Sequence, residues 1–298
     1  MQQKNPYLPL TLGVIAVSFA AIFIKLSSAP ALVIASYRML FAFICLLPVV
    51  LWRYRIGLAS ISRPNRLLML LSGLFLALHF ACWISSFRFT TVASSTVLVS
   101  TQPIFVVIFS YLLFREKISK RQLIAVLIAI VGSIVIGLAD AGKGIGSASL
   151  WGDTLALLGA VFAAGYFLCG KAVRADVAVM PYAAGVYGIS ALALLLISTL
   201  SHTPLYPYSP RDFLLFIGLA VVCTVIGHSV LNWSLGFLPA AAVGVAVLGE
   251  PIGASFWAMV LFNEIPSSGQ LLGGGLLLIG ILLFMLQPAA ARQMRKLS

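Results

Sequence analysis

Two stretches of this chain, "LFREKISKRQL" (residues 113–123) and "LFNEIPSSGQL" (residues 261–271), share one pattern but differ in charge. Each reads Leu-Phe-x-Glu, then Ser, then Gln-Leu, yet the first contains four basic residues and the second contains none. A register of 148 residues holds without a gap from Phe89 to Leu138, which indicates an internal duplication. The pairs in this register include Phe89 and Phe237, Pro103 and Pro251, Glu116 and Glu264, Gln122 and Gln270, and Gly132 and Gly280.

The composition around these stretches indicates a protein that is embedded in a membrane. Of its 298 residues 61% are hydrophobic and only 9% are charged, and the mean hydropathy is +1.10. Soluble domains have about 25% charged residues. The net charge of +12 does not indicate a nucleic-acid partner, because the basic residues lie in short gaps between apolar runs.

Apolar windows of about 20 residues, the length that crosses a bilayer as a helix, fit this sequence ten times. They cover residues 8–27, 31–52, 66–87, 91–114, 120–140, 150–171, 178–200, 211–236, 239–262 and 267–287. The runs lack the alternation of a transmembrane barrel, so we predict an all-α membrane protein. The first window also resembles a signal peptide, but it is long enough to span the membrane and has a counterpart later in the chain.

Positive charge is distributed unevenly between the two sides of this arrangement. With the N-terminus in the cytoplasm, fourteen Lys and Arg residues lie on that side, whereas the other side has three, with Lys25 at the end of the first window. The positive-inside rule therefore predicts that both termini are cytoplasmic. We expect a multi-pass protein of the inner (plasma) membrane.

The duplication and this orientation together explain the difference in charge between the two opening stretches. Each copy contains five windows, and an odd number inserts the second copy upside down. We therefore predict two inverted five-helix repeats, over residues 1–141 and 148–288, and a basic cytoplasmic tail over residues 289–298. The turn at 115–121 faces the cytoplasm, and its counterpart at 263–269 faces outside, where positive charge is disfavoured. Inverted repeats are typical of secondary transporters, whose sites lie near the midplane.

The same features resemble the drug/metabolite transporter superfamily, of the EamA type. They are the proline within the fourth window of each copy, the Glu that ends that window ("LFRE", "LFNE"), and the following Gln and glycine-containing window. The segment "YRMLFA" in the second window resembles the family's arginine there, but its counterpart in the second copy has no arginine. The resemblance covers essentially the whole chain, and it implies the transport of small metabolites, mostly outward, including amino acids and drugs.

Polar and aromatic residues repeat at helical spacing within the third and eighth windows. The third window places His79 and Trp83 on one face, and the eighth places His228 and Asn232 on one face with Trp233 beside them. Polar groups inside a membrane are costly, so each is a candidate for substrate binding. The alternatives are a histidine that is hydrogen-bonded in a helix contact and a proton relay. No carboxylate or thiol has the spacing of a metal ligand, so no metal is predicted.

The fourth window of each copy contains the next set of candidates. Ser95 and Gln102 lie seven residues apart on one face, and Gln102 corresponds to Glu250 in the second copy. Pro103 and Pro251 each remove a backbone hydrogen bond, to the carbonyls of residues 99 and 247. These carbonyls either line a cavity or belong to a plain helix kink that a neighbouring Ser or Thr relieves. Glu250 is either a proton-titrating group, a helix-contact residue or a substrate ligand.

An arginine and a group of aromatic residues could also either bind substrate or have a structural role. Arg38 either binds a substrate carboxylate or extends toward the outer interface. Tyr166 is one of several deep aromatic residues that either line an apolar cavity or pack in the core. The candidate substrate-binding residues are His79, Trp83, Ser95, Gln102, Tyr166, His228, Asn232, Trp233 and Glu250.

These observations predict a secondary transporter and not an enzyme, and they predict no cofactor. We expect it to export small metabolites or to facilitate their movement by alternating access, with hydrophobic or aromatic amino acids as the preferred cargo. The alternative is a proton-coupled exporter of amphipathic cationic drugs. Its expected partners are the small-molecule substrate and the lipid bilayer, and it is expected to be a monomer or a homodimer.

Overall fold

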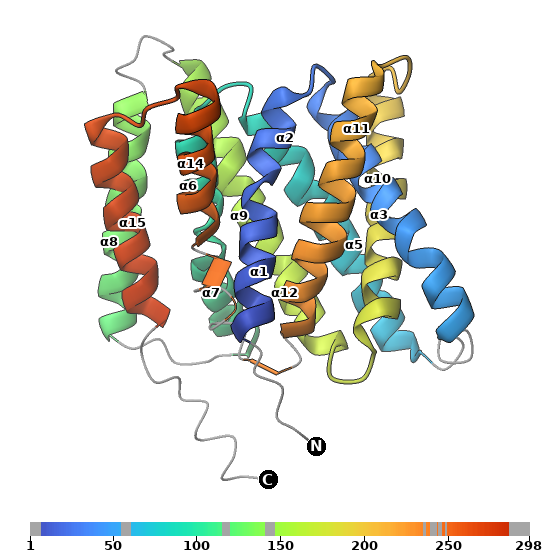
Figure 1. Cartoon of the computed structure of the whole chain (residues 1–298). Helices are drawn as coiled ribbons and strands as arrows, with labels where there is room; N and C mark the ends of the chain where they lie inside the picture. The colour runs from blue at the N-terminus through green and yellow to red at the C-terminus, as the bar shows by residue number, and fades with distance from the viewer. Residues whose placement is uncertain are drawn as a thin grey trace.

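Long apolar segments satisfy their backbone hydrogen bonds internally as helices, and the computed structural model is a bundle of such helices (Figure 1). It describes residues 7–54, 61–114, 120–140, 147–234, 237–238, 243, 246–247 and 249–285, among which no strand occurs. The helices are α1 (Tyr7–Ser18), α2 (Ala20–Leu26), α3 (Ala31–Arg53), α5 (Arg63–Ser86), α6 (Val92–Val99), α7 (Gln102–Phe114), α8 (Lys120–Asp140), α9 (Ser147–Val173), α10 (Val179–Leu200), α11 (Pro210–Gly218), the π-helix η2 (Leu219–His228), α12 (Ser229–Ser234), α14 (Gly249–Phe262) and α15 (Ser268–Met285).

Helices occupy the described part of each window that the sequence predicts to cross the membrane. Within the described residues, six helical segments are long and apolar enough to span a bilayer: Leu8–Leu26, Ala31–Arg53, Arg63–Ser86, Ser149–Val173, Val179–Leu200 and Pro210–Ser234. Shorter apolar helices accompany them at Val92–Val106, Leu123–Ile136 and Ser268–Gly280. The prediction of an all-helical, multi-pass membrane protein is therefore confirmed.

The window at 91–114 is divided into α6 and α7, because the helix is interrupted just before Pro103. Proline has no N–H group and cannot donate to the carbonyl of Val99. The hydroxyls of Ser100 and Thr101 donate to carbonyls about one turn earlier, at 2.8 and 2.7 Å. These hydroxyls bond the carbonyls of Thr96 and Leu98, and thus support the last turn of α6.

A π-helix, η2, interrupts the helical segment between α11 and α12. It has 10 residues, and the hydroxyl of Thr224 donates to the carbonyl of Leu219, five residues earlier, at 3.0 Å. π-Helices are rare and are frequently found at functional sites. η2 packs against α1 and α3, so this unusual segment lies within the bundle.

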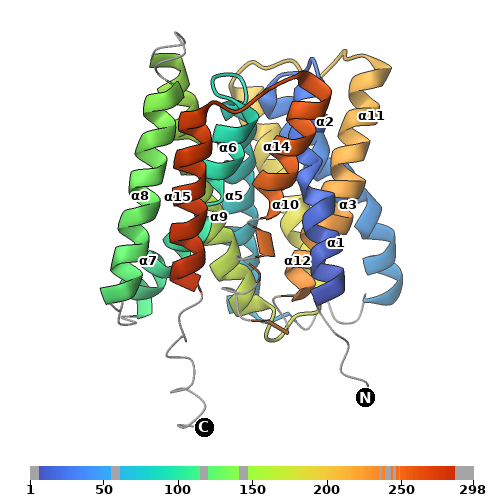
Figure 2. The ribbon, with the colours of Figure 1, turned by 60° about the vertical axis from the view of Figure 1, so that its left-hand side comes forward.

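Helices α8 and α15 pack side by side at one edge of the bundle (Figures 1 and 2). Their backbones approach closely at small residues. A Cβ atom on Gly132 would lie 2.6 Å from the carbonyl oxygen of Gly273, and one on Gly280 would lie 2.7 Å from the backbone nitrogen of Ala129. The close packing that small residues favour therefore occurs here within one chain.

Two glycines of α15 provide a matched test of this contact. A Cβ on Gly273 would lie 2.7 Å from a backbone oxygen, whereas a Cβ on Gly275 would have no atom within 4 Å. We expect Gly273→Ala to destabilise the protein by about 1–3 kcal/mol. Gly275→Ala should be neutral or should stabilise it by up to about 1 kcal/mol, because alanine favours the helix. Melting temperatures in detergent should separate the variants, and equal temperatures would contradict the close contact.

The start of the first described helix and the end of the last one lie at the same end of the bundle (Figure 1). Helix α1 begins and α15 ends at the lower end in Figure 1, whereas α2 ends and α14 passes into α15 at the upper end. The turn between α9 and α10 and the end of α12 also lie at the lower end. We call these the lower and upper ends below.

Candidate functional site

A small cavity lies where the interrupted helices meet the middle of the bundle. Its volume is about 50 Å³, far below the roughly 300–1,000 Å³ of typical small-molecule pockets. It is lined by His79, Trp83, Val99, Ser100, Gln102, Ala163, Tyr166, Phe167, His228, Leu231, Val247 and Glu250. The cavity must therefore widen before it can contain a metabolite.

Equivalent positions of the two sequence copies meet in this lining. Val99 and Val247 are 148 residues apart, as are Gln102 and Glu250, and all four line the cavity. Each valine lies four residues before a proline, so its carbonyl lacks the usual helical donor. The cavity lining that includes Val99 is consistent with the cavity interpretation of the α6–α7 break.

The third predicted window contributes His79 and Trp83 from α5. The ring of His79 lies parallel to that of Trp83, with centroids 5.7 Å apart and an interplanar angle of 13°. His79 Nδ1 lies 3.0 Å from the carbonyl oxygen of Gly159 on α9. His79 is therefore hydrogen-bonded in a helix contact and also lines the cavity, so these two interpretations are compatible.

The eighth predicted window places its polar residues at and beside the cavity. His228, the last residue of η2, is in the lining, and its ring meets the edge of Phe80 at a centroid distance of 5.6 Å. Asn232 is buried behind the lining, where its Oδ1 accepts a 2.8 Å hydrogen bond from the hydroxyl of Tyr166. Tyr166 itself lines the cavity.

Two predicted residues lie elsewhere. Ser95 is fully buried, and its hydroxyl lies 2.6 Å from that of Ser86. Trp233 packs against Phe237, with ring centroids 4.6 Å apart. Neither residue is part of the cavity lining. Phe167 and Leu231 also line the cavity. They could not be predicted from the sequence, because apolar residues in apolar helices give no signal of their own.

Arg38 lies deeper than the interfacial interpretation allowed. Its side chain is 0% exposed, so that interpretation is wrong. Its Nε donates to the hydroxyl of Thr224 in η2 at 2.8 Å, and its guanidinium lies 4.1 Å from the centroid of Phe80. The π-helix therefore positions a hydroxyl against a cation buried inside the bundle.

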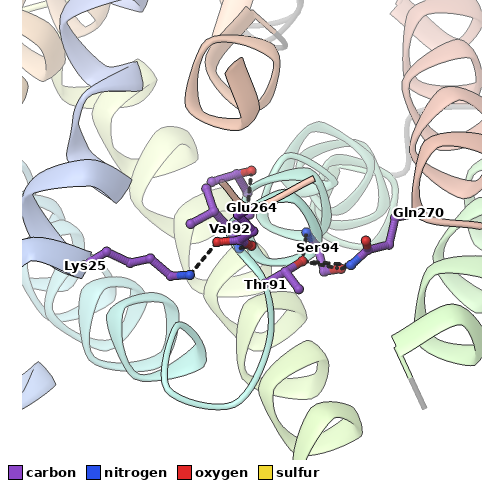
Figure 3. A network of polar contacts seen from close by, with 7 residues as sticks. Lys25, Thr91, Val92, Ser94, Glu264 and Gln270 are labelled. Atoms are coloured by element: carbon purple, nitrogen blue, oxygen red, sulfur yellow. Dashed lines mark hydrogen bonds and ion pairs between the residues drawn. The ribbon is translucent and has the colours of Figure 1, made fainter. Parts of the chain in front are cut away.

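A second polar cluster lies near the upper end, where the opening stretch 261–271 meets α6 (Figure 3). Glu264 forms an ion pair with Lys25 and accepts a 2.6 Å hydrogen bond from the backbone N–H of Val92. Gln270 donates to the hydroxyls of Thr91 and Ser94, at 2.8 and 3.0 Å. We call these six residues the α6 network.

The pattern shared by the two opening stretches thus includes residues with a structural role. Glu264 and Gln270 both contact the first turn of α6, and Gln270 also forms a capping box with Ser267. Their counterpart Glu116 and the turn at 115–119 lie outside the described residues, as does the segment at 239–242 that would correspond to the start of α6.

Comparisons with known proteins identify the family. The sequence profile of the EamA-like transporter family matches residues 6–138 and again residues 150–286. An uncharacterized transporter of Archaeoglobus fulgidus is 24% identical over 93% of this chain and 95% of its own. The pseudopaline exporter CntI of Pseudomonas aeruginosa is 24% identical over 74% of this chain and 75% of its own.

Further similarities agree with this identification. The inner membrane protein YtfF of Escherichia coli is 25% identical over 85% of this chain and 86% of its own. A protein of known crystal structure superposes with a TM-score of 0.68 over 98% of this chain and 99% of its own, at 17% identity, which shows the shared fold alone. The chain therefore belongs to the EamA-like transporter family and is a multi-pass membrane transporter, not an enzyme.

Proposed function

We propose that the protein exports small metabolites across the inner membrane by alternating access, with hydrophobic or aromatic amino acids as its preferred cargo. The observation that carries this proposal is the cavity lined by Val99 and Gln102 from one copy and Val247 and Glu250 from the other. A site built from equivalent positions of two repeats is typical of secondary transporters. The aromatic residues of the lining suit an apolar side chain.

The proposed architecture is ten transmembrane helices in two inverted repeats, over residues 1–141 and 148–288. The contacts between α8 and α15 support it. Gly132 faces the backbone of residues 273 and 277, and shifting these positions back by 148 residues gives 125 and 129, which are the alanines that Gly280 faces. Contacts that map onto each other when the copies are exchanged are expected from a two-fold axis between inverted repeats.

We further propose that the lower end of the bundle faces the cytoplasm. The excess of Lys and Arg in the connections assigned to that side supports this orientation. It is also consistent with α1 beginning and α15 ending at the lower end (Figure 1). The basic tail at 289–298 lies outside the described residues, and its place in the cytoplasm is part of the same proposal.

Alternating access requires that polar contacts close each end in turn. At the upper end, the α6 network links α2, α6 and the turn before α15. At the lower end, Arg174 donates to the carbonyl of Asn232 on α12 at 3.4 Å, and Asn65 donates to Asp176 at 3.1 Å. The small cavity is consistent with a conformation in which neither end is widely open.

The second candidate function is a proton-coupled exporter of amphipathic cationic drugs. Glu250 favours it, because a carboxyl group in the lining can carry a proton or meet a cation. Transport by purified protein in proteoliposomes, with a panel of amino acids and cationic drugs, distinguishes the two candidates. Amino-acid uptake without drug uptake supports the first candidate, and the reverse result supports the second.

Trp83 tests the position of the site. Its side chain lines the cavity and is 2% exposed, whereas Trp52 is 84% exposed at the end of α3. We expect Trp83→Ala to reduce amino-acid transport about tenfold or more, equivalent to about 1.4 kcal/mol of lost interaction. The amount of folded protein in the membrane should stay near normal, and Trp52→Ala should leave transport unchanged. If Trp83→Ala fails to accumulate, the side chain belongs to the core and not to the site.

A further inference from the structure

The guanidinium of Arg38 is buried with part of its hydrogen-bonding capacity unused. Its Nε donates to Thr224, but neither terminal nitrogen has a hydrogen-bond partner among the residues that the structure describes. No described carboxylate lies within ion-pair distance of it. A guanidinium stays charged and strongly favours two acceptors held side by side. The arrangement therefore lacks a group that could accept both terminal N–H pairs.

Other polar nitrogens beside the cavity share this property. Trp83 Nε1, His228 Nδ1 and Asn232 Nδ2 are buried and have no hydrogen-bond partner within the described part of the chain. Trp83 and His228 line the cavity, and Asn232 uses its oxygen to accept from Tyr166. Buried polar groups are normally satisfied, so their concentration here indicates a site whose hydrogen-bond acceptors come from a bound molecule or water.

Arg38 lies one side chain behind this lining. Its guanidinium rests on the face of Phe80, and the same ring contacts both cavity histidines, with centroid distances of 4.7 Å to His79 and 5.6 Å to His228. Because the cavity must widen to hold a metabolite, a displacement of Phe80 would bring the guanidinium into contact with the solute.

The rest of the polar lining includes hydrogen-bond acceptors as well as donors. The carbonyls of Val99 and Val247 are released by the prolines that follow them, and Gln102 and Glu250 add side-chain oxygens. These acceptors come from the α6–α7 break and its counterpart before Pro251, whereas the unused donors come from α3, α5, η2 and α12. The site therefore presents donors and acceptors on different helices.

We infer that Arg38 recognises the carboxylate of a zwitterionic solute, while the helix-break oxygens receive its ammonium group. This inference rests on the proposed transport function, and it specifies which groups of the solute the site recognises. It also opposes the cationic-drug alternative, because a buried guanidinium close to the cavity repels a solute with positive charge alone. Trp83 and His228 supply further donors beside the carboxylate.

The inference is tested with three compounds that share one ring: phenylalanine, phenethylamine, which lacks the carboxylate, and 3-phenylpropionate, which lacks the ammonium group. In proteoliposomes that contain the wild-type protein, phenethylamine should compete with labelled phenylalanine about tenfold more weakly than phenylalanine itself or worse. Arg38→Gln should raise the KM for phenylalanine about tenfold and abolish this preference, and Arg38→Lys should be intermediate. Equal competition by phenethylamine in the wild type would overturn the inference.

A binding measurement separates this inference from the proposed cargo and from a folding defect. In detergent, 3-phenylpropionate should raise the melting temperature of the wild-type protein but not that of Arg38→Gln. If no amino acid is transported but this stabilisation is seen, the cargo proposal fails and the carboxylate site stands. If neither phenylalanine nor 3-phenylpropionate raises the melting temperature of the wild-type protein, the inference fails. Should Arg38→Gln not fold, the comparison of the three compounds with the wild-type protein decides alone.

Discussion

Replacing Glu250 with glutamine is expected to preserve most of the transport, whereas replacing it with leucine is expected to reduce it strongly. The equivalent position of the first copy is Gln102, and both side chains line the same cavity. An amide is therefore already accommodated at one of these two positions. Glutamine keeps a carbonyl oxygen that can accept from a solute ammonium group, but leucine keeps none.

The size of the leucine effect follows from the hydrogen bonds that would be lost. A polar partner left unsatisfied in a buried site costs about 1–3 kcal/mol, which corresponds to roughly 5- to 150-fold in binding. Uptake into proteoliposomes should be measured for the wild type, Glu250→Gln and Glu250→Leu, with and without an imposed pH gradient. Wild-type uptake that the gradient drives uphill, and that Glu250→Gln loses, would show a proton-coupling role and favour the second candidate function.

Removing Glu264 is expected to open the upper end of the transporter. Its carboxylate both pairs with Lys25 and accepts from Val92, so Glu264→Ala removes the two bonds that join α2, α6 and the turn before α15 (Figure 3). The Lys25 pair is partly exposed and contributes about 1 kcal/mol or less. The hydrogen bond from Val92 to the charged carboxylate contributes about 1.5–3 kcal/mol, so its loss should shift the balance between closed and open conformations roughly ten- to hundredfold. Transport should fall, because a return to the closed state becomes rate-limiting.

This shift can be measured with a cysteine in the cavity. Val99→Cys places a thiol in the lining, in a background whose native cysteines have been replaced. A membrane-impermeant maleimide added from outside should react with it faster in Glu264→Ala than in the parent. Glu264→Gln and Lys25→Met each remove the ion pair but not the contact with Val92, so both should give similar, intermediate rates. Unchanged labelling in folded Glu264→Ala protein would show that the α6 network is only structural.

Local patterns in the sequence were sufficient for the helical fold and for part of the site. Apolar length and the spacing of the two prolines are local properties, and they pointed to residues 99 and 247, both of which line the cavity. His79 and Trp83 were predicted to share one helix face, and both line the cavity, because α5 is continuous through both residues. These predictions required no knowledge of which helices are neighbours.

Other features depended on tertiary contacts and could not be predicted. Ser95 and Gln102 were placed on one face of one helix, but α6 ends before α7 begins, so the two side chains do not share a face. Trp233 was assigned to the site beside Asn232, yet adjacent residues of a helix point about 100° apart, and Asn232 is the one that turns toward Tyr166.

The burial of the Arg38 side chain inside the bundle also depended on tertiary contacts. Its position in the second window was compatible with either an interfacial or a buried guanidinium. The packing of α3 against the π-helix, with Thr224 and Phe80 as neighbours, decides between them. Nothing in the apolar pattern of residues 219–228 indicates a π-helix, so this contact was not predictable from the sequence.

In the proposed architecture the two copies of the sequence cross the membrane in opposite orientations, and cysteine labelling at the two opening stretches tests this most directly. The background would lack the native thiols of Cys45, Cys82, Cys169 and Cys223. One cysteine replaces Ser119, and the other replaces Ser268, which is exposed at the start of α15. In intact cells, an impermeant maleimide should label Ser268→Cys at once and Ser119→Cys only after the membrane is permeabilised. Labelling of both positions from the same side would contradict the inverted-repeat account.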